Sequence, residues 1–105
     1  MTDPTRFSGR TAVVTGGAAG IGLAVASRIA AEGGKVALWD RDPAAIAAAT
    51  ATLGSASLGI ALDVSDWEAV EAAAKTTADT FGGIDILVAS AGITGPNTTT
   101  WTYPV

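Results

Sequence analysis

The sequence predicts an α/β fold in which short buried strands alternate with helices. The first apolar run, Ala12–Val14, is short and rich in β-branched residues, as expected of a strand covered on both faces. Apolar residues later recur at steps of three and four, the spacing of one helix face. Glycine pairs at 33–34 and 82–83 end two of these helical segments. The resulting order, β-α-β-α-β-α-β, predicts a parallel sheet with right-handed crossovers.

The first strand–helix unit follows a polar lead-in at residues 1–9. We expect its strand at about 10–15 and its helix at about 20–33. Apolar residues four apart predict the inward face of this helix: Ile21, Val25 and Ile29.

The second unit is expected to have its strand at 35–40 and its helix at about 43–53. Asp42 is a residue type that caps helix N-termini, and Pro43 suits the first helical position. Gly54 is expected to end the helix.

The third unit is expected to have its strand at 57–62 and its helix at about 66–81. Ser65 and Glu68 have the spacing of a capping box, with the serine as N-cap and the glutamate three residues later. Residues at steps of three and four predict the apolar stripe of this helix: Trp67, Val70, Ala74, Ala78 and Phe81.

A fourth strand is expected at 84–89, within which Asp85 is assigned a structural or solvent-facing role. Residues 90–105 show neither helical nor strand periodicity and contain Pro96, Pro104 and a run of three threonines. They are predicted to form a loop tail.

Composition limits the functions that the chain can have. Its 105 residues suit one small domain, and the 49% hydrophobic content excludes a disordered chain. The net charge of −4 and the lack of a basic run disfavour nucleic-acid binding. Cysteine and histidine are absent, so we expect no disulfide, no thiol catalysis and no metal site. Neither a signal peptide nor a membrane-spanning run is evident, and we expect a cytoplasmic protein with no membrane partner.

A glycine-rich turn, Thr15-Gly16-x-x-x-Gly20-x-Gly22, joins the first strand to the first helix. The unpaired N–H groups and the dipole of the helix start favour a phosphate there. This motif near the N-terminus resembles that of the short-chain dehydrogenase/reductases, which bind NAD or NADP on a Rossmann-type sheet. The predicted phosphate-binding residues are those of the turn and the helix start: Gly16, Ala18, Ala19, Gly20, Ile21 and Gly22.

The end of the second strand predicts the choice of cofactor. Asp40 lies about 20 residues beyond the glycines, where a carboxylate can accept hydrogen bonds from the adenosine ribose. A carboxylate also repels the 2′-phosphate of NADP, so NAD is favoured. Arg41 could instead stack on adenine or meet a phosphate, and Asp40 could simply begin a turn with Asp42 and Pro43.

The resemblance assigns two further groups of cofactor-binding residues. Asp63 and Val64 occupy the positions that flank the adenine ring in the family, although Asp63 could also cap a loop near Ser65. Ser90, Ala91 and Gly92 correspond to the end of the family's Asn-Asn-Ala-Gly motif, and Ala89-Ser90 replaces its two asparagines. The loss of an amide donor predicts a less rigid sheet edge there.

The family's catalytic residues are a Tyr-x-x-x-Lys pair, a serine and an asparagine, and all lie farther along than residue 105. Tyr103 cannot take the place of the tyrosine because no lysine lies four residues after it. The resemblance therefore implies the cofactor-binding portion of an enzyme that interconverts secondary alcohols and ketones, of the 3-oxoacyl-carrier-protein reductase or sugar dehydrogenase type. We expect the chain alone to have no catalytic residue and no turnover, and to meet a small-molecule substrate only in a full-length parent. The alternative is a stand-alone nucleotide-binding or interaction module without catalysis.

The resemblance also implies a partial Rossmann-type sheet of four strands in the order 3-2-1-4 with three helices. In this order, the first two helices cover one face and the third lies alone on the other. The fourth strand becomes an unpaired apolar edge. We therefore expect marginal stability or self-association through that edge and face.

Overall fold

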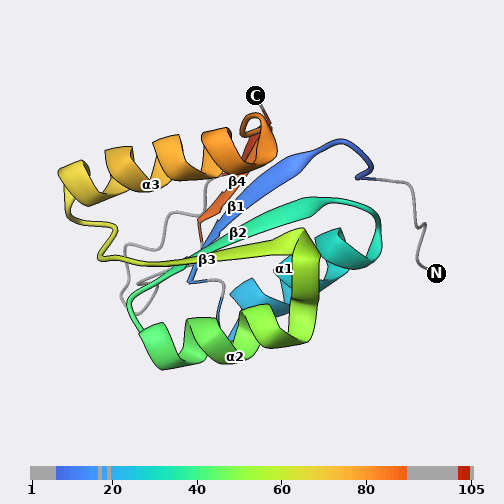
Figure 1. Cartoon of the computed structure of the whole chain (residues 1–105), viewed down its shortest axis with the longest axis horizontal. Helices are drawn as coiled ribbons and strands as arrows, with labels where there is room; N and C mark the ends of the chain where they lie inside the picture. Colours follow the sequence, from blue (N-terminus) through green and yellow to red (C-terminus); the bar gives the residue numbers. More distant parts are fainter. Residues whose placement is uncertain (1–6, 17, 19, 90–101, 105) are drawn as a thin grey trace.

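A computed structural model describes residues 7–16, 18, 20–89 and 102–104. The strands and helices alternate as the sequence predicts (Figure 1). In chain order the elements are β1 (Thr11–Thr15), α1 (Gly20–Ala31), β2 (Lys35–Asp40), α2 (Pro43–Leu53), the short 3₁₀ helix η1 (Gly54–Ala56), β3 (Ser57–Ala61), α3 (Trp67–Phe81), β4 (Ile86–Ala89) and β5 (Thr102–Pro104).

The sheet has the order β3-β2-β1-β4-β5. Its first four strands pair in parallel, which confirms the predicted 3-2-1-4 order. Strand β5 pairs antiparallel with β4.

Two predictions about the end of the chain are therefore wrong. Thr102–Pro104 is a strand and not part of a loop, and β4 is not an unpaired edge. A strand edge has free N–H and C=O groups that another extended segment can pair with, whatever its side-chain periodicity. A three-residue strand is too short to show that periodicity in sequence. The rest of the predicted tail, 90–101 and 105, lies outside the described residues.

Helices α1 and α2 cover one face of the sheet and α3 covers the other, as predicted (Figure 1). Successive residues of β1 alternate between these layers, so that Ala12 and Val14 pack toward α1 and α2 and Val13 packs toward α3. In β2, Val36 and Leu38 belong to the first layer. The two layers form separate apolar clusters, both built on the central strands.

The inward face of α1 differs from the prediction. Ile21 is 79% exposed, whereas Gly22, Ala26 and Ile29 are buried. Small residues at Gly22 and Ala26 let the helix lie close to the sheet, and this packing turns Ile21 outward. Apolar spacing alone had favoured the larger side chains.

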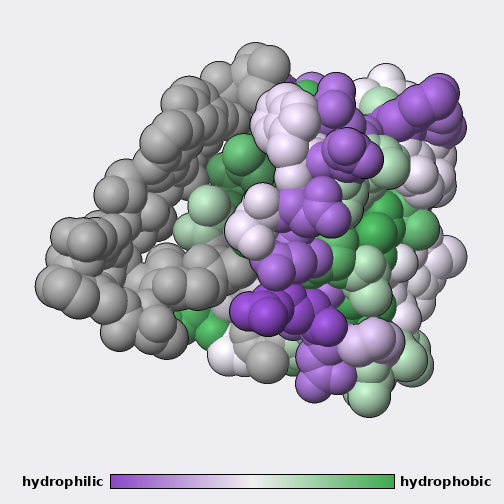
Figure 2. All heavy atoms as spheres, turned by 90° about the vertical axis from the view of Figure 1, so that its left-hand side faces the viewer, coloured by the Kyte–Doolittle hydropathy of each residue, from purple (hydrophilic) through white to green (hydrophobic). Residues whose placement is uncertain are grey.

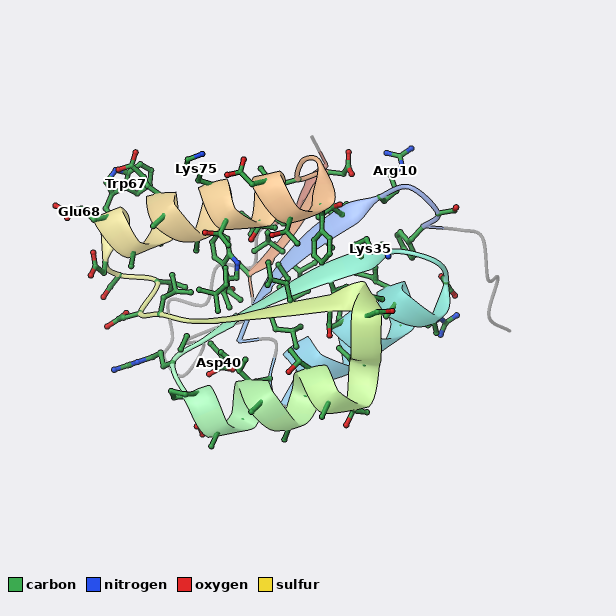
Figure 3. The ribbon with its side chains drawn as sticks, in the orientation of Figure 1. Arg10, Lys35, Asp40, Trp67, Glu68 and Lys75 are labelled. Carbon is green, nitrogen blue, oxygen red and sulfur yellow. The ribbon has the colours of Figure 1, made fainter. Side chains whose placement is uncertain are left out.

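The start of α3 also differs from the prediction. The N-cap is Asp66, whose carboxylate accepts from the backbone N–H of Ala69 at 3.2 Å. The predicted capping box of Ser65 and Glu68 is therefore wrong, and the N–H and hydroxyl of Ser65 both donate to Asp63 instead. Trp67, predicted to be apolar core, is 70% exposed at the first position of α3 (Figure 3).

The ends of α2 agree with the sequence. Asp42 accepts hydrogen bonds from the N–H groups of Ala44 and Ala45, and Pro43 occupies the first turn. Gly54 ends the helix with φ +75°, a conformation that favours glycine.

Candidate cofactor-binding site

The candidate site lies at the end of the sheet where parallel strands finish and helices begin. Figure 3 shows Asp40 at this end and Arg10 and Lys35 at the opposite end. Figure 2 looks onto the same end and shows hydrophilic residues in a band across it. In open parallel sheets, ligands bind outside the carboxyl ends of the strands.

The glycine-rich turn depends on backbone conformations that favour glycine. Gly16 has φ +67° and Gly20 has φ +59°. The N–H of Gly16 donates to the carbonyl of Trp39 at 2.7 Å, so the turn is fixed to the end of β2. A Cβ built on Gly20 would meet no described atom within 4 Å, so only the backbone conformation requires glycine there. Among the described residues, space is therefore open beside the first residue of α1.

Asp40 faces the glycine-rich turn. Its Oδ2 accepts a hydrogen bond from the N–H of Ala18 at 3.2 Å, and its Oδ1 accepts one from the N–H of Asp42 at 3.2 Å. The second bond also makes Asp40 the start of the turn before α2, so that alternative holds as well. A carboxylate can accept about four hydrogen bonds, so these two leave capacity for ribose hydroxyls.

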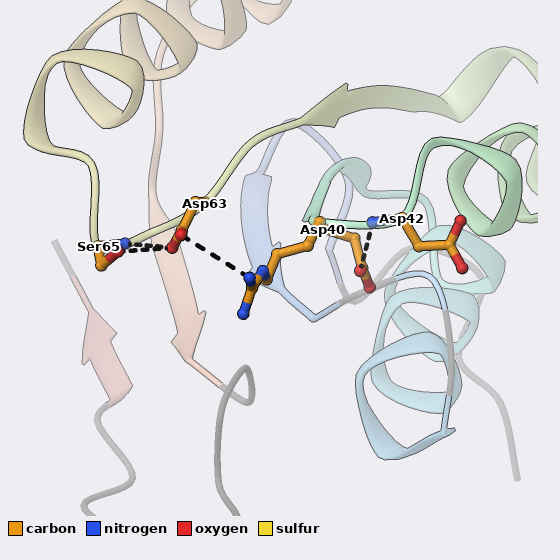
Figure 4. Close-up of polar contacts among 5 residues, drawn as sticks. Asp40, Asp42, Asp63 and Ser65 are labelled. Carbon is orange, nitrogen blue, oxygen red and sulfur yellow. Dashed lines mark hydrogen bonds and ion pairs between the residues drawn. The ribbon is translucent and has the colours of Figure 1, made fainter.

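A second polar pair lies beside Asp40, at the ends of β2 and β3. The Nη2 of Arg41 lies 4.0 Å from the Oδ2 of Asp63. The other carboxylate oxygen of Asp63 accepts from the N–H of Ser65 at 2.9 Å and from its hydroxyl at 2.7 Å (Figure 4). These two hydrogen bonds, more than the Arg41 charge, hold the pKa of Asp63 below its ordinary 3.8. Asp63 thus has the loop-capping role that the sequence left open.

The structure brings together most of the predicted residues that it describes. Gly16, Ala18 and Asp40 are joined directly or through β2, and Gly20 begins the adjacent helix. Val64 is 40% exposed next to Asp63. Of the other predicted residues, Gly22 is buried and Ile21 exposed on α1, and Ala19, Ser90, Ala91 and Gly92 lie outside the described residues.

The Trp39 carbonyl holds the glycine-rich turn and is not among the predicted residues, because no side-chain pattern identifies a carbonyl acceptor. Ser65 orients Asp63, as the loop-capping alternative expects, and its position two residues after an aspartate is a recognisable turn signal.

The described residues offer binding groups rather than an acid–base pair at this end. Lys35 lies at the far end of the sheet, and Lys75 pairs with Asp79 at 2.9 Å on α3. Within the described ranges no cluster of acidic, cysteine or histidine residues could hold a metal ion. None of the described helices is both long and apolar enough to span a membrane.

A parallel sheet with a glycine turn, an open helix N-terminus and an acidic residue ending β2 defines a dinucleotide-binding α/β protein. The family model for short chain dehydrogenase matches residues 10–102. The chain therefore belongs to the short chain dehydrogenase family, whose members bind a nicotinamide dinucleotide.

Individual relatives agree with this assignment. The chain is 54% identical over 100 residues to a 2-dehydro-3-deoxy-L-rhamnonate dehydrogenase (NAD(+)) from Sphingomonas sp. (strain SKA58), covering 95% of this chain and 40% of that protein. A glucose/ribitol short-chain dehydrogenase structure from Brucella melitensis matches with a TM-score of 0.82 and 38% identity, over 90% of this chain and 40% of that one. The NADP-bound C-domain of a bacterial malonyl-CoA reductase matches with a TM-score of 0.81 and 33% identity, over 88% of this chain and 16% of that one. The chain thus spans about 40% of the length of its first curated relative.

Proposed function

We propose that this chain is the NAD-binding portion of a dehydrogenase that interconverts a secondary alcohol and a ketone. The observation that supports NAD is the carboxylate of Asp40, which lies 3.2 Å from the amide of Ala18 in the glycine-rich turn. There it can accept from both ribose hydroxyls and repels a 2′-phosphate.

Each part of the cofactor has a matching group in this proposal. The diphosphate lies against the amides at the start of α1, where Gly16 and Gly20 allow close approach. The adenosine ribose binds Asp40, and the adenine lies beside Asp63 and Val64. Bound NAD supplies the hydride acceptor, and the described residues bind and orient it.

The relatives support one substrate class for the parent. The 54% identity to a dehydrogenase of a deoxy sugar acid supports a sugar-derived secondary alcohol or ketone as the parent's substrate. The 3-oxoacyl-carrier-protein reductase type remains the second candidate. We expect the catalytic groups to belong to a longer parent, so the 105-residue chain with NAD and a sugar alcohol should form no NADH.

Calorimetric titration of the chain with NAD and NADP tests the proposal. We expect NAD to bind more tightly than NADP. Asp40→Ala should weaken NAD binding by at least about tenfold, because charge-assisted hydrogen bonds are lost. Asp40→Asn keeps the size of the side chain and should weaken NAD binding less.

Asp79→Ala is the matched control, since it removes an exposed carboxylate on α3. It should leave NAD affinity unchanged. Equal effects of Asp40→Ala and Asp79→Ala, or no heat with millimolar NAD, would contradict the proposal. Binding of NAD by a natural 105-residue product would instead favour the stand-alone module.

A further inference from the structure

Arg41 is the cation nearest in sequence to the proposed ribose site, since it directly follows Asp40. Its side chain is 78% exposed, and its Nη2 lies 4.0 Å from Asp63 Oδ2. Figure 4 shows this ion pair running from the end of β2 to the loop after β3. The guanidinium is therefore directed to a neighbouring strand end and not back toward the glycine-rich turn.

The Asp63 carboxylate is oriented by hydrogen bonds that do not involve Arg41. Its Oδ1 accepts two hydrogen bonds from Ser65, one from the backbone and one from the hydroxyl. These bonds fix the carboxylate and leave Oδ2 facing the guanidinium. The Asp63 carboxylate is thus already oriented toward Arg41. This lowers the entropy cost of forming a surface ion pair that would otherwise be weak.

The charges around the ribose site depend on this pair. An arginine near the ribose is the group that accommodates the 2′-phosphate of NADP. The residues Asp40, Arg41, Asp42 and Asp63 carry three carboxylates and one guanidinium, for a formal charge of −2. With Arg41 drawn to Asp63, a 2′-phosphate would meet the Asp40 carboxylate without a cation beside it.

We propose that Asp63, oriented by Ser65, withholds Arg41 from the ribose and thereby sets the preference for NAD over NADP. This inference rests on the proposed function. Asp63 acts here as a positioning residue, because its effect on the 2′-phosphate passes through Arg41. Arg41 is therefore a cation suited to the 2′-phosphate of NADP, and its ion pair with Asp63 keeps it away from that phosphate.

The test compares the ratio of NADP to NAD affinity in variants of the whole chain. Both cofactors share adenine, so any direct effect of Asp63 on that ring cancels in the ratio. Asp63→Asn should raise the ratio by about fivefold, the scale of one released surface charge. Asp63→Glu keeps the charge and should leave the ratio close to that of the wild type.

The role of Arg41 is tested by combining substitutions. Arg41→Ala in the wild type should change the ratio little, whereas adding it to Asp63→Asn should abolish the gain. Ser65→Ala should also raise the ratio, by a smaller factor than Asp63→Asn. The Asp63 charge remains, but the carboxylate loses one of the two hydrogen bonds that orient it toward Arg41.

An unchanged ratio in Asp63→Asn, or a gain that persists in the double variant, overturns the inference while NAD binding itself stands. A wild-type chain that binds neither dinucleotide overturns both this inference and the proposed function.

Discussion

Asp63 lies at the surface, and yet its pKa is lower than that of a free aspartate. The hydrogen bonds from the backbone and hydroxyl of Ser65 are the main cause of its lowered pKa. We expect Ser65→Ala to raise the pKa of Asp63 toward 3.8 without reaching it, since the backbone bond survives. An NMR titration of the Asp63 carboxyl carbon measures this directly. Arg41→Ala should raise the pKa less than Ser65→Ala, and the reverse order would contradict the assignment of causes.

The lowered pKa has a defined effect on stability. A carboxylate with a pKa depressed in the folded state stabilises that state above its unfolded pKa, and the stabilisation is lost as the pH falls through the folded value. Denaturant unfolding of the wild type and Asp63→Asn should therefore differ near neutral pH and converge below about pH 3.8, the ordinary value. A difference that grows on acidification would have the wrong sign.

At the residue scale, the sequence identified charged groups better than it identified orientations. Asp40 could be placed because a strand end and a glycine turn fix where it lies. The apolar character of Ile21 and Trp67 suggests burial, but both are exposed. The buried residues include Gly22 and Ala26 on α1, and Ala73 and Thr77 on α3. Ser65 is not the N-cap of α3, since its N–H and hydroxyl donate to Asp63 while Asp66 accepts from the first-turn amide of Ala69.

At the element scale, Gly59 controls how closely α2 lies on β3. A Cβ at this position would overlap with Cγ2 of Ile46 and would meet Cγ2 of Thr50 at 3.0 Å. Both neighbours are β-branched and stiff, so they cannot easily move aside. Gly59→Ala should lower the free energy of unfolding by about 1–3 kcal/mol, whereas alanine in an uncrowded strand would raise it. Urea unfolding measures the change.

A double-mutant cycle separates crowding from backbone effects. Ile46→Ala removes the overlapping methyl and is itself destabilising, as Ile46 is buried. In its presence, Gly59→Ala should cost less than it does in the wild type. Additive costs would place the effect in the backbone and contradict the close approach of α2.

Element boundaries were predictable where local chemistry decides them. Asp42, Pro43 and Gly54 bound α2 through bonds and dihedral angles within a few residues. The pairing of β5 with β4 joins segments that are distant in sequence, and three residues give no periodic signal. The sheet order was predictable because right-handed crossovers leave few alternatives.

At the scale of the whole molecule, the described helices cover the two faces of the sheet unequally. Four parallel strands about 4.8 Å apart form a face about 19 Å wide, and a helix with its side chains is about 10 Å wide. Two helices therefore cover such a face, and one helix covers about half of it. The face beneath α3 accordingly has half-buried apolar residues, among them Leu58, Ile60 and Leu87. Burial of that face against a second copy would remove apolar surface from water.

We therefore expect the 105-residue chain to self-associate through the sheet face that α3 leaves uncovered. The melting temperature should rise with protein concentration, because association stabilises the folded state by mass action. Sedimentation velocity over the same concentrations should show a mass above 10.3 kDa. Leu58→Gln should weaken association through the sheet face, whereas Trp67→Glu should not, since Trp67 points away from the sheet on α3. Loss of association in Trp67→Glu would place the contact on the outer surface of α3. A sharply melting monomer at all concentrations would show that α3 is sufficient to cover this face.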